Sequence, residues 1–115
     1  MSTDNNRLLI ELEKRIRDLN REIINPTIPA LGVDDLTPVM QLVARARATY
    51  LAELFAITAA VGEGLPNGDQ LNALRRLRLT YEELLQGAQA LETAIQRGYL
   101  DVAAAGGGRP VGESA

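Results

Sequence analysis

The side chains that could bind a charged ligand are mostly arginines. The chain has eleven arginines and one lysine, and a guanidinium group suits the geometry of phosphate oxygens. The candidate basic patch consists of Arg45, Arg47, Arg75, Arg76 and Arg78. Such a patch could bind the backbone of a nucleic acid. The alternative is a solvated helix face on which Arg78 pairs with Glu82, and the net charge of −3 also disfavours nucleic acid as the main partner.

The residue types that usually carry catalysis or bind metals are missing. The chain has no histidine and no cysteine, which excludes imidazole bases, thiolate nucleophiles and the commonest zinc ligands. Carboxylates remain, and Glu53 is notable because it lies in an apolar segment. We expect Glu53 to be buried and paired with an arginine, as a structural element. We predict no catalytic residue, no cofactor and no metal site.

Three segments have helical periodicity, and none has the alternation of a strand. The predicted helices span about residues 4–24, 37–61 and 69–97. We therefore predict an all-α fold, an elongated antiparallel three-helix bundle with coiled-coil-like seams over residues 1–102. Residues 103–115 are rich in glycine and should form a flexible, disordered tail.

Prolines, glycines and capping residues predict where these helices begin and end. Pro26 disfavours helical geometry at the residue before it and should end the first helix there. Thr37–Pro38 is a helix start signal, and Asp69 is expected to cap the third helix. Gly62 and Gly98 should end the second and third helices in the left-handed conformation.

The first and third helices carry apolar residues at alternating steps of three and four, the heptad pattern of coiled-coil packing. The seam of the first helix consists of Leu9, Leu12, Ile16, Leu19 and Ile23. The seam of the third helix consists of Leu74, Leu77, Tyr81, Leu84, Ala88, Leu91 and Ile95. Either seam could close within one chain or be shared with another chain.

The second helix is apolar on two sides, which predicts a central helix with more than one neighbour. One face consists of Val39, Val43, Ala46, Tyr50, Leu54, Ile57 and Val61. The other consists of Ala44, Ala48, Leu51, Phe55 and Thr58. The connector before this helix is also apolar at Ile28, Leu31 and Val33, so we expect it to pack across the bundle.

These observations favour a non-enzymatic interaction or scaffold subunit that binds other proteins through helix faces, above all a second copy of itself as a homodimer or higher oligomer. The alternative is a small regulatory nucleic-acid-binding protein that uses the arginines of the second and third helices. The polar N-terminus and the lack of a long apolar run predict a cytoplasmic protein with no membrane contact. The excess of arginine and alanine suggests a bacterial source.

Deleting residues 104–115 should leave the melting temperature unchanged, because this segment has almost nothing apolar to bury. Thermal unfolding of the full and shortened chains, followed by circular dichroism, tests this expectation. A clear drop in melting temperature would mean that the segment docks on the helices or on a partner.

Overall fold

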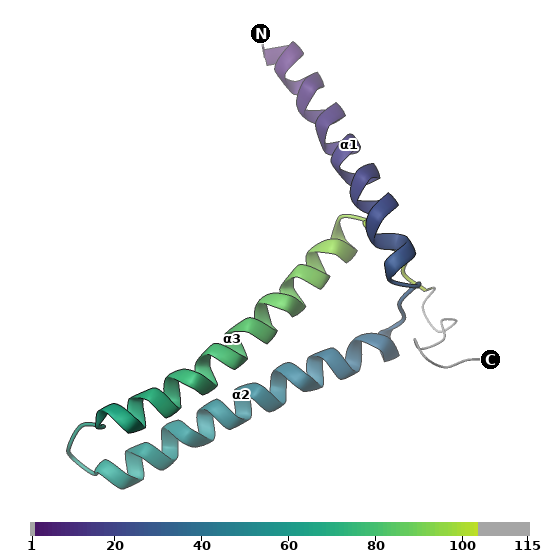
Figure 1. Ribbon diagram of the computed structural model, residues 1–115. Helices are drawn as coiled ribbons and strands as arrows, with labels where there is room; N and C mark the ends of the chain where they lie inside the picture. The colour runs from purple at the N-terminus through teal and green to yellow at the C-terminus, as the bar shows by residue number, and fades with distance from the viewer. Residues whose placement is uncertain (1, 104–115) are drawn as a thin grey trace. The chain divides into compact units, whose positions relative to one another are not determined.

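The computed structural model describes residues 2–103, and three α-helices contain most of them (Figure 1). Helix α1 spans Ser2–Thr27, α2 spans Val33–Val61 and α3 spans Gly68–Gln96. No strand occurs within these residues. The predicted all-α class with three helices is therefore confirmed. The tail expected over 103–115 lies, apart from Ala103, outside the described residues.

The chain divides into two compact units. The hairpin unit, Thr37–Ala90, holds most of α2 and α3. The α1 unit combines Met1–Leu36 with Leu91–Ala115, so α1 is grouped with the end of α3 and with the segment that follows it.

In the hairpin unit, α2 and α3 lie side by side and antiparallel, as Figure 1 shows. Val43 and Ile57 of α2 are only 7% and 5% exposed and form the small buried core of this unit. Tyr81 of the α3 seam stacks on Tyr50 of α2, with ring centroids 6.1 Å apart. The five residues of the α3 seam that belong to this unit, from Leu74 to Ala88, therefore lie on the side of α3 that faces α2, and all five are half-buried.

The packed face of α2 differs from the predicted one at one position. Glu53 is half-buried on that helix, whereas Leu54 is among the exposed residues. No ion pair to Glu53 exists within residues 2–103 and no charged side chain there is buried, so the predicted buried pair is wrong. A half-buried carboxylate keeps contact with water, and this avoids the cost of full desolvation.

The second apolar face of α2 has no cover in the structure. Phe55 is 73% exposed, and Leu51 and Met40 are also exposed. Within the hairpin unit, no neighbour packs on this face, contrary to the expectation that α2 contacts neighbours on two sides. In the hairpin unit one side of α2 is packed and the other is open.

Helix α1 continues past the residue at which Pro26 was expected to end it. Thr27 is its last residue, and the amide of Ile28 still donates to the Ile24 carbonyl oxygen at 3.0 Å. Near a helix end Pro26 removes only one internal hydrogen bond, and the Asn25 side chain is held by the Asp101 amide. Pro29, which disfavours helical geometry at Ile28, marks the real end.

Helix α2 begins four residues before the predicted start. Its first residue is Val33, and Thr37–Pro38 lies inside the second turn. The Asp35 carboxylate accepts a hydrogen bond from the Gly32 amide at 2.8 Å, and the Asp35 amide donates to the Gly32 carbonyl at 3.1 Å. This reciprocal pair holds Gly32 directly before the first helical residue, Val33. The carboxylates of Asp34 and Asp35 lie in the first turn, at the positive end of the helix dipole.

Helix α3 is capped by Asn67 and not by Asp69. The Asn67 side chain accepts from the Gln70 amide at 2.8 Å, and the Gln70 side chain accepts from the Asn67 amide at 2.9 Å. This is a capping box, in which two unpaired amides of the first turn are satisfied reciprocally. The predicted cap at Asp69 was wrong because Asn67 and Gln70 have the three-residue spacing that a reciprocal pair requires.

The predicted glycine ends of α2 and α3 are confirmed. Gly62 and Gly98 have positive φ angles of 58° and 73°. At Gly98 the amide donates to Ile95 at 3.2 Å, and the next amide, of Tyr99, donates to Ala94 at 2.9 Å. These two bonds form a Schellman motif, which turns the chain out of the helix direction.

Replacing Asn67 with alanine should destabilise the protein by about 1 kcal/mol, because the capping hydrogen bond to Gln70 is lost. For a domain of this size this corresponds to a melting temperature lower by about 4–8 °C. The matched control is Asp69→Ala, which should have the smaller effect. A larger loss from Asp69→Ala than from Asn67→Ala would contradict the observed cap.

Candidate protein-interaction surface

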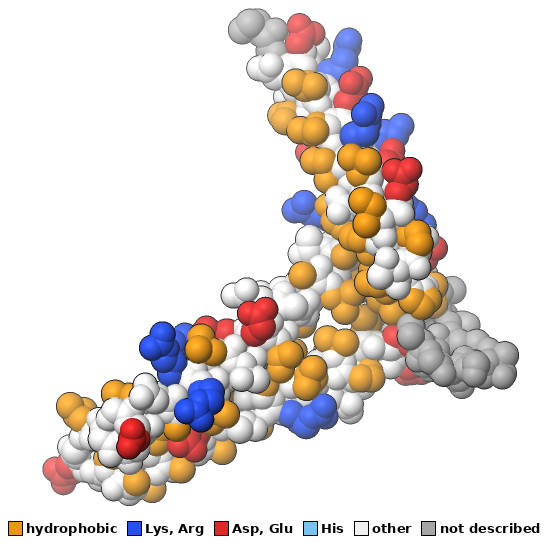
Figure 2. All heavy atoms as spheres, viewed as in Figure 1, with side chains coloured by type: hydrophobic (Ala, Val, Ile, Leu, Met, Phe, Trp, Pro, Cys, Tyr) orange, Lys and Arg blue, Asp and Glu red, His pale blue; other side chains and the backbone are white. Residues whose placement is uncertain are grey.

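The seam of α1 is a continuous row of exposed apolar side chains. The exposed fractions of its side chains are 40% for Ile16, 49% for Leu12 and Leu19, 54% for Leu9 and 71% for Ile23. Every residue from 3 to 19 is exposed. Figure 2 shows hydrophobic side chains running along α1, with charged side chains beside them. This surface, the α1 seam, is a heptad stripe whose five side chains are all exposed.

A different side of α1 binds the segment that follows α3. The Arg21 guanidinium donates to the Gly98 carbonyl oxygen at 3.1 Å and forms an ion pair with the Asp101 carboxylate. One turn later, the Asn25 side-chain oxygen accepts from the Asp101 amide at 3.1 Å. These contacts join residues about 80 positions apart and hold residues 98–101 against α1.

The same segment supplies the small core of the α1 unit. Leu100 is 3% exposed and Leu31 is 7% exposed. Leu31 also forms an isolated parallel bridge with Val102. The Leu31 amide donates to Asp101 at 3.1 Å, and the Ala103 amide donates to Leu31 at 2.6 Å. The expectation that Leu31 packs is confirmed, whereas Val33, at the start of α2, is exposed.

The seam and the segment-binding side lie on nearly opposite sides of α1. A helix turns by about 100° per residue, which places Arg21 and Asn25 about 160° around the axis from the centre of the seam. The contacts that hold residues 98–103 therefore do not use the seam. The polar contacts and the seam therefore lie on different sides of α1, although Ile16 of the seam also lines a pocket with the turn after α3.

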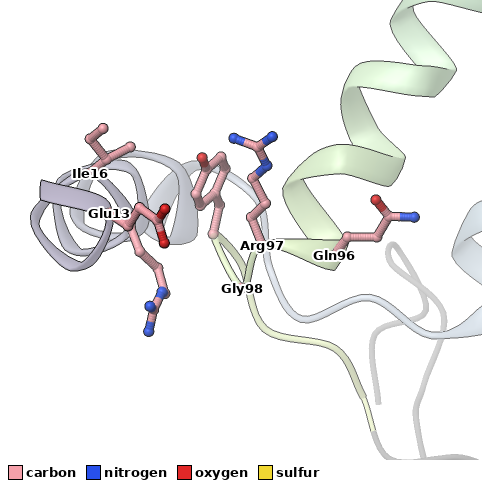
Figure 3. A pocket seen from close by; sticks show the side chains of 7 residues that line it. Glu13, Ile16, Gln96, Arg97 and Gly98 are labelled. Atoms are coloured by element: carbon pink, nitrogen blue, oxygen red, sulfur yellow. The ribbon is translucent and has the colours of Figure 1, made fainter. Parts of the chain in front are cut away.

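A pocket of about 660 Å³ lies between α1 and the turn after α3, all within the α1 unit. Figure 3 shows Glu13 and Ile16 on the α1 side and Arg97 and Gly98 on the other side. It has side chains of both charges, and none of them is buried. The pocket therefore has no enclosed polar group that would orient a small ligand or activate a nucleophile.

Two arginines of the candidate basic patch are engaged within the hairpin unit. Arg47 donates from Nε to the Tyr81 hydroxyl at 3.0 Å, and its guanidinium carbon lies 5.2 Å from the Tyr81 ring centroid. Arg78 pairs with Glu82 at 3.1 Å, as predicted. Arg45, Arg75 and Arg76 are exposed. Two of the five cations are thus already satisfied by neighbours in the fold.

The described part of the chain contains no candidate metal site and no candidate membrane-spanning helix. Within residues 2–103, no group of three or more acidic, histidine or cysteine side chains is placed to hold a metal ion. No helix in the same range is long and apolar enough to cross a lipid bilayer. Comparisons with protein-family models, curated proteins and solved structures find no match to this chain. Function must therefore be inferred from the surfaces themselves.

Sequence reasoning identified the α1 seam but missed the contacts on the other side of α1. Arg21, Asn25 and Asp101 look like ordinary surface residues because their partners are distant in sequence. A weak signal existed after Gly98, where Leu100 and Val102 are spaced by two, as in a short extended segment with one packed side.

Replacing Arg21 with alanine should loosen the segment 98–103. Both side chains of the Arg21–Asp101 pair are nearly half exposed, so we expect a loss of about 1 kcal/mol. Hydrogen exchange at the Leu31 and Ala103 amides should accelerate about fivefold, since these amides make the hydrogen bonds between the two segments. The control is Lys14→Ala, a cation one heptad earlier on the same side of α1. Equal exchange rates in both variants would show that Arg21 does not hold the segment.

Proposed function

We propose that this chain is a non-enzymatic protein-interaction subunit that self-associates through the α1 seam. The supporting observation is the exposed row of five aliphatic side chains at heptad spacing. Soluble proteins rarely leave a contiguous apolar stripe of this kind in water unless it binds something. A heptad stripe is the surface that another helix with the same pattern covers best.

A second copy of the chain is the partner that the seam fits without further assumptions. A two-fold axis brings the same stripe of both copies together, so each residue of the seam meets an apolar residue. The seam of α3 cannot serve in the same way, because it is half-buried against α2 in the hairpin unit. Of the two predicted seams, we therefore propose the α1 seam as the self-association surface.

The expected affinity follows from the exposed area. Complete burial of a leucine or isoleucine contributes about 1.5–3 kcal/mol, so five half-exposed side chains on each of two copies contribute about 10 kcal/mol. Association costs about 4–15 kcal/mol in lost translational and rotational freedom of the two copies. The gain and the cost are similar in size, so we expect a reversible dimer whose population depends on concentration.

Nucleic-acid binding has no observation in its favour beyond the three exposed arginines of the patch. Arg47 and Arg78 already have partners, and the net charge is −3. We therefore advance one function only. The cytoplasmic location and bacterial source expected from the sequence remain part of this proposal.

Replacing Leu12 or Leu19 with aspartate should convert the dimer to a monomer, because each dimer would then bury two carboxylates at one layer of the seam. The measurement is absolute mass by light scattering on a sizing column at several concentrations. The wild-type chain should approach twice 12.4 kDa as concentration rises, and each variant should stay near 12.4 kDa.

The matched control is Ile10→Asp, because Ile10 is 68% exposed on α1 but points about 140° away from the centre of the seam. This control should retain the wild-type mass. A wild-type chain that stays monomeric at millimolar concentration would refute the proposal. Equal dissociation by Ile10→Asp would show that the seam is not the contact.

A further inference from the structure

We infer that the two α1 helices of the dimer pair parallel and in register, as a two-stranded coiled coil. This inference rests on the proposed function and adds the geometry of the partner copy. It follows from which residue occupies each position of the seam, from the charges beside the seam and from the side of α1 that the chain already uses.

The steps of three and four determine the heptad positions of the seam. Position a is occupied by Leu9, Ile16 and Ile23. The next seam residue lies three positions after Leu9 and three after Ile16, and Ile23 ends the seam four positions after Leu19. Leu12 and Leu19 occupy position d for the converse reason. Two of the three a positions therefore hold β-branched isoleucine, and both d positions hold leucine.

This division of isoleucine and leucine is the one that favours two strands when helices pair in parallel. In a parallel dimer, side chains at a and at d meet their neighbours at different angles, and isoleucine at a with leucine at d suits two strands. In-register pairing also places every seam residue opposite its own equivalent. All five layers, from Leu9 to Ile23, are then apolar.

The charges that flank the seam are compatible with parallel pairing. In a parallel coiled coil a residue at g lies beside the e residue five positions later on the other helix. The resulting pairs are Leu8 with Glu13, Arg15 with Asn20 and Glu22 with Thr27. No pair brings two like charges together, so nothing along the flanks opposes this arrangement.

Each antiparallel alignment of the two α1 helices either brings like charges together or loses an apolar layer of the seam. One alignment places Arg15 opposite Arg15 and Glu13 opposite Glu13, which is repulsive on both flanks. Sliding by one heptad places Arg15 opposite Glu22 but leaves Leu9 facing Pro26 at the end of the helix. An exposed ion pair contributes less free energy than a buried leucine layer, so the parallel pairing retains the larger stabilisation.

The α1 unit leaves room for this pairing. Arg21 occupies position f, which faces away from the partner helix in a coiled coil, and it binds Gly98 and Asp101 there. These polar contacts are thus made outside the seam, although Ile16 of the seam also lines the pocket that Gly98 and Tyr99 help to form. Each copy can keep its own segment docked while the two seams meet.

Single cysteines test the geometry cleanly, because the chain has none of its own. The variants are Leu9→Cys and Ile23→Cys, studied in the full chain under mild oxidation at a concentration at which the reduced protein is dimeric. In the parallel dimer each cysteine faces its equivalent, so both variants should form disulfide-linked dimers in most chains. The control, Ile10→Cys, should link several-fold less.

The antiparallel geometry predicts the opposite pattern. In the two antiparallel alignments residue 9 lies opposite residue 19 or 26 and residue 23 opposite residue 5 or 12, so each is at least about 15 Å along the helix from its own equivalent. A disulfide requires Cα atoms within about 7 Å. Neither variant would then link to itself, whereas a mixture of Leu12→Cys with Ile23→Cys, or of Leu9→Cys with Leu19→Cys, would form mixed dimers. That result would overturn the parallel inference and leave the proposed function standing.

Absolute mass separates failure of the inference from failure of the proposed function. Light scattering on the reduced cysteine variants should give the dimer mass. A monomer mass for the reduced variants and for the wild-type chain would overturn both proposals together. A dimer mass combined with self-linking at both positions supports both.

Discussion

The contact between Arg21 and the segment after Gly98 organises the α1 unit. Gly98 turns the chain out of α3, and Arg21 binds the carbonyl oxygen of this turn and the carboxylate of Asp101. Asn25 adds the third contact. Together they hold this segment beside Leu31, and Leu31 and Leu100 are the two most buried residues of this unit. The polar contacts of Arg21 and Asn25, together with these two buried leucines, thus join the segment after α3 to α1.

The position of these polar contacts also explains why the side chains of the α1 seam are exposed. Because Arg21 and Asn25 use one side of α1, the helix is held in place without covering its opposite side. The apolar residues from Leu9 to Ile23 are then left without an intramolecular role. In the hairpin unit the comparable stripe on α3 is half-buried against α2. The same heptad pattern is therefore half-buried in α3 and exposed in α1, and only the tertiary structure distinguishes the two.

The number and position of the helices could be predicted from the sequence because they depend on local patterns. Apolar periodicity located all three, and Gly62 and Gly98 ended two of them as expected. The errors arose where a residue's partner determines the outcome. Pro26 did not end α1, Asp69 did not cap α3, and Glu53 was not buried with an arginine. The seam residues themselves were predictable, but their exposure was not, because periodicity shows that a stripe exists and not what covers it.

The exposure of α1 from Thr3 to Leu12 has a consequence for how this helix is stabilised. None of these residues is buried, so this part of the helix is held mainly by its own backbone hydrogen bonds and side-chain propensities. A helical stretch of about ten residues is marginal in water when only these local contributions hold it. Covering the seam would add the missing tertiary stabilisation, so helix formation at the start of α1 is thermodynamically linked to association. In the proposed dimer, the affinity would include the free energy of ordering this part of the chain, and substitutions that favour helix there would tighten binding without changing a seam residue.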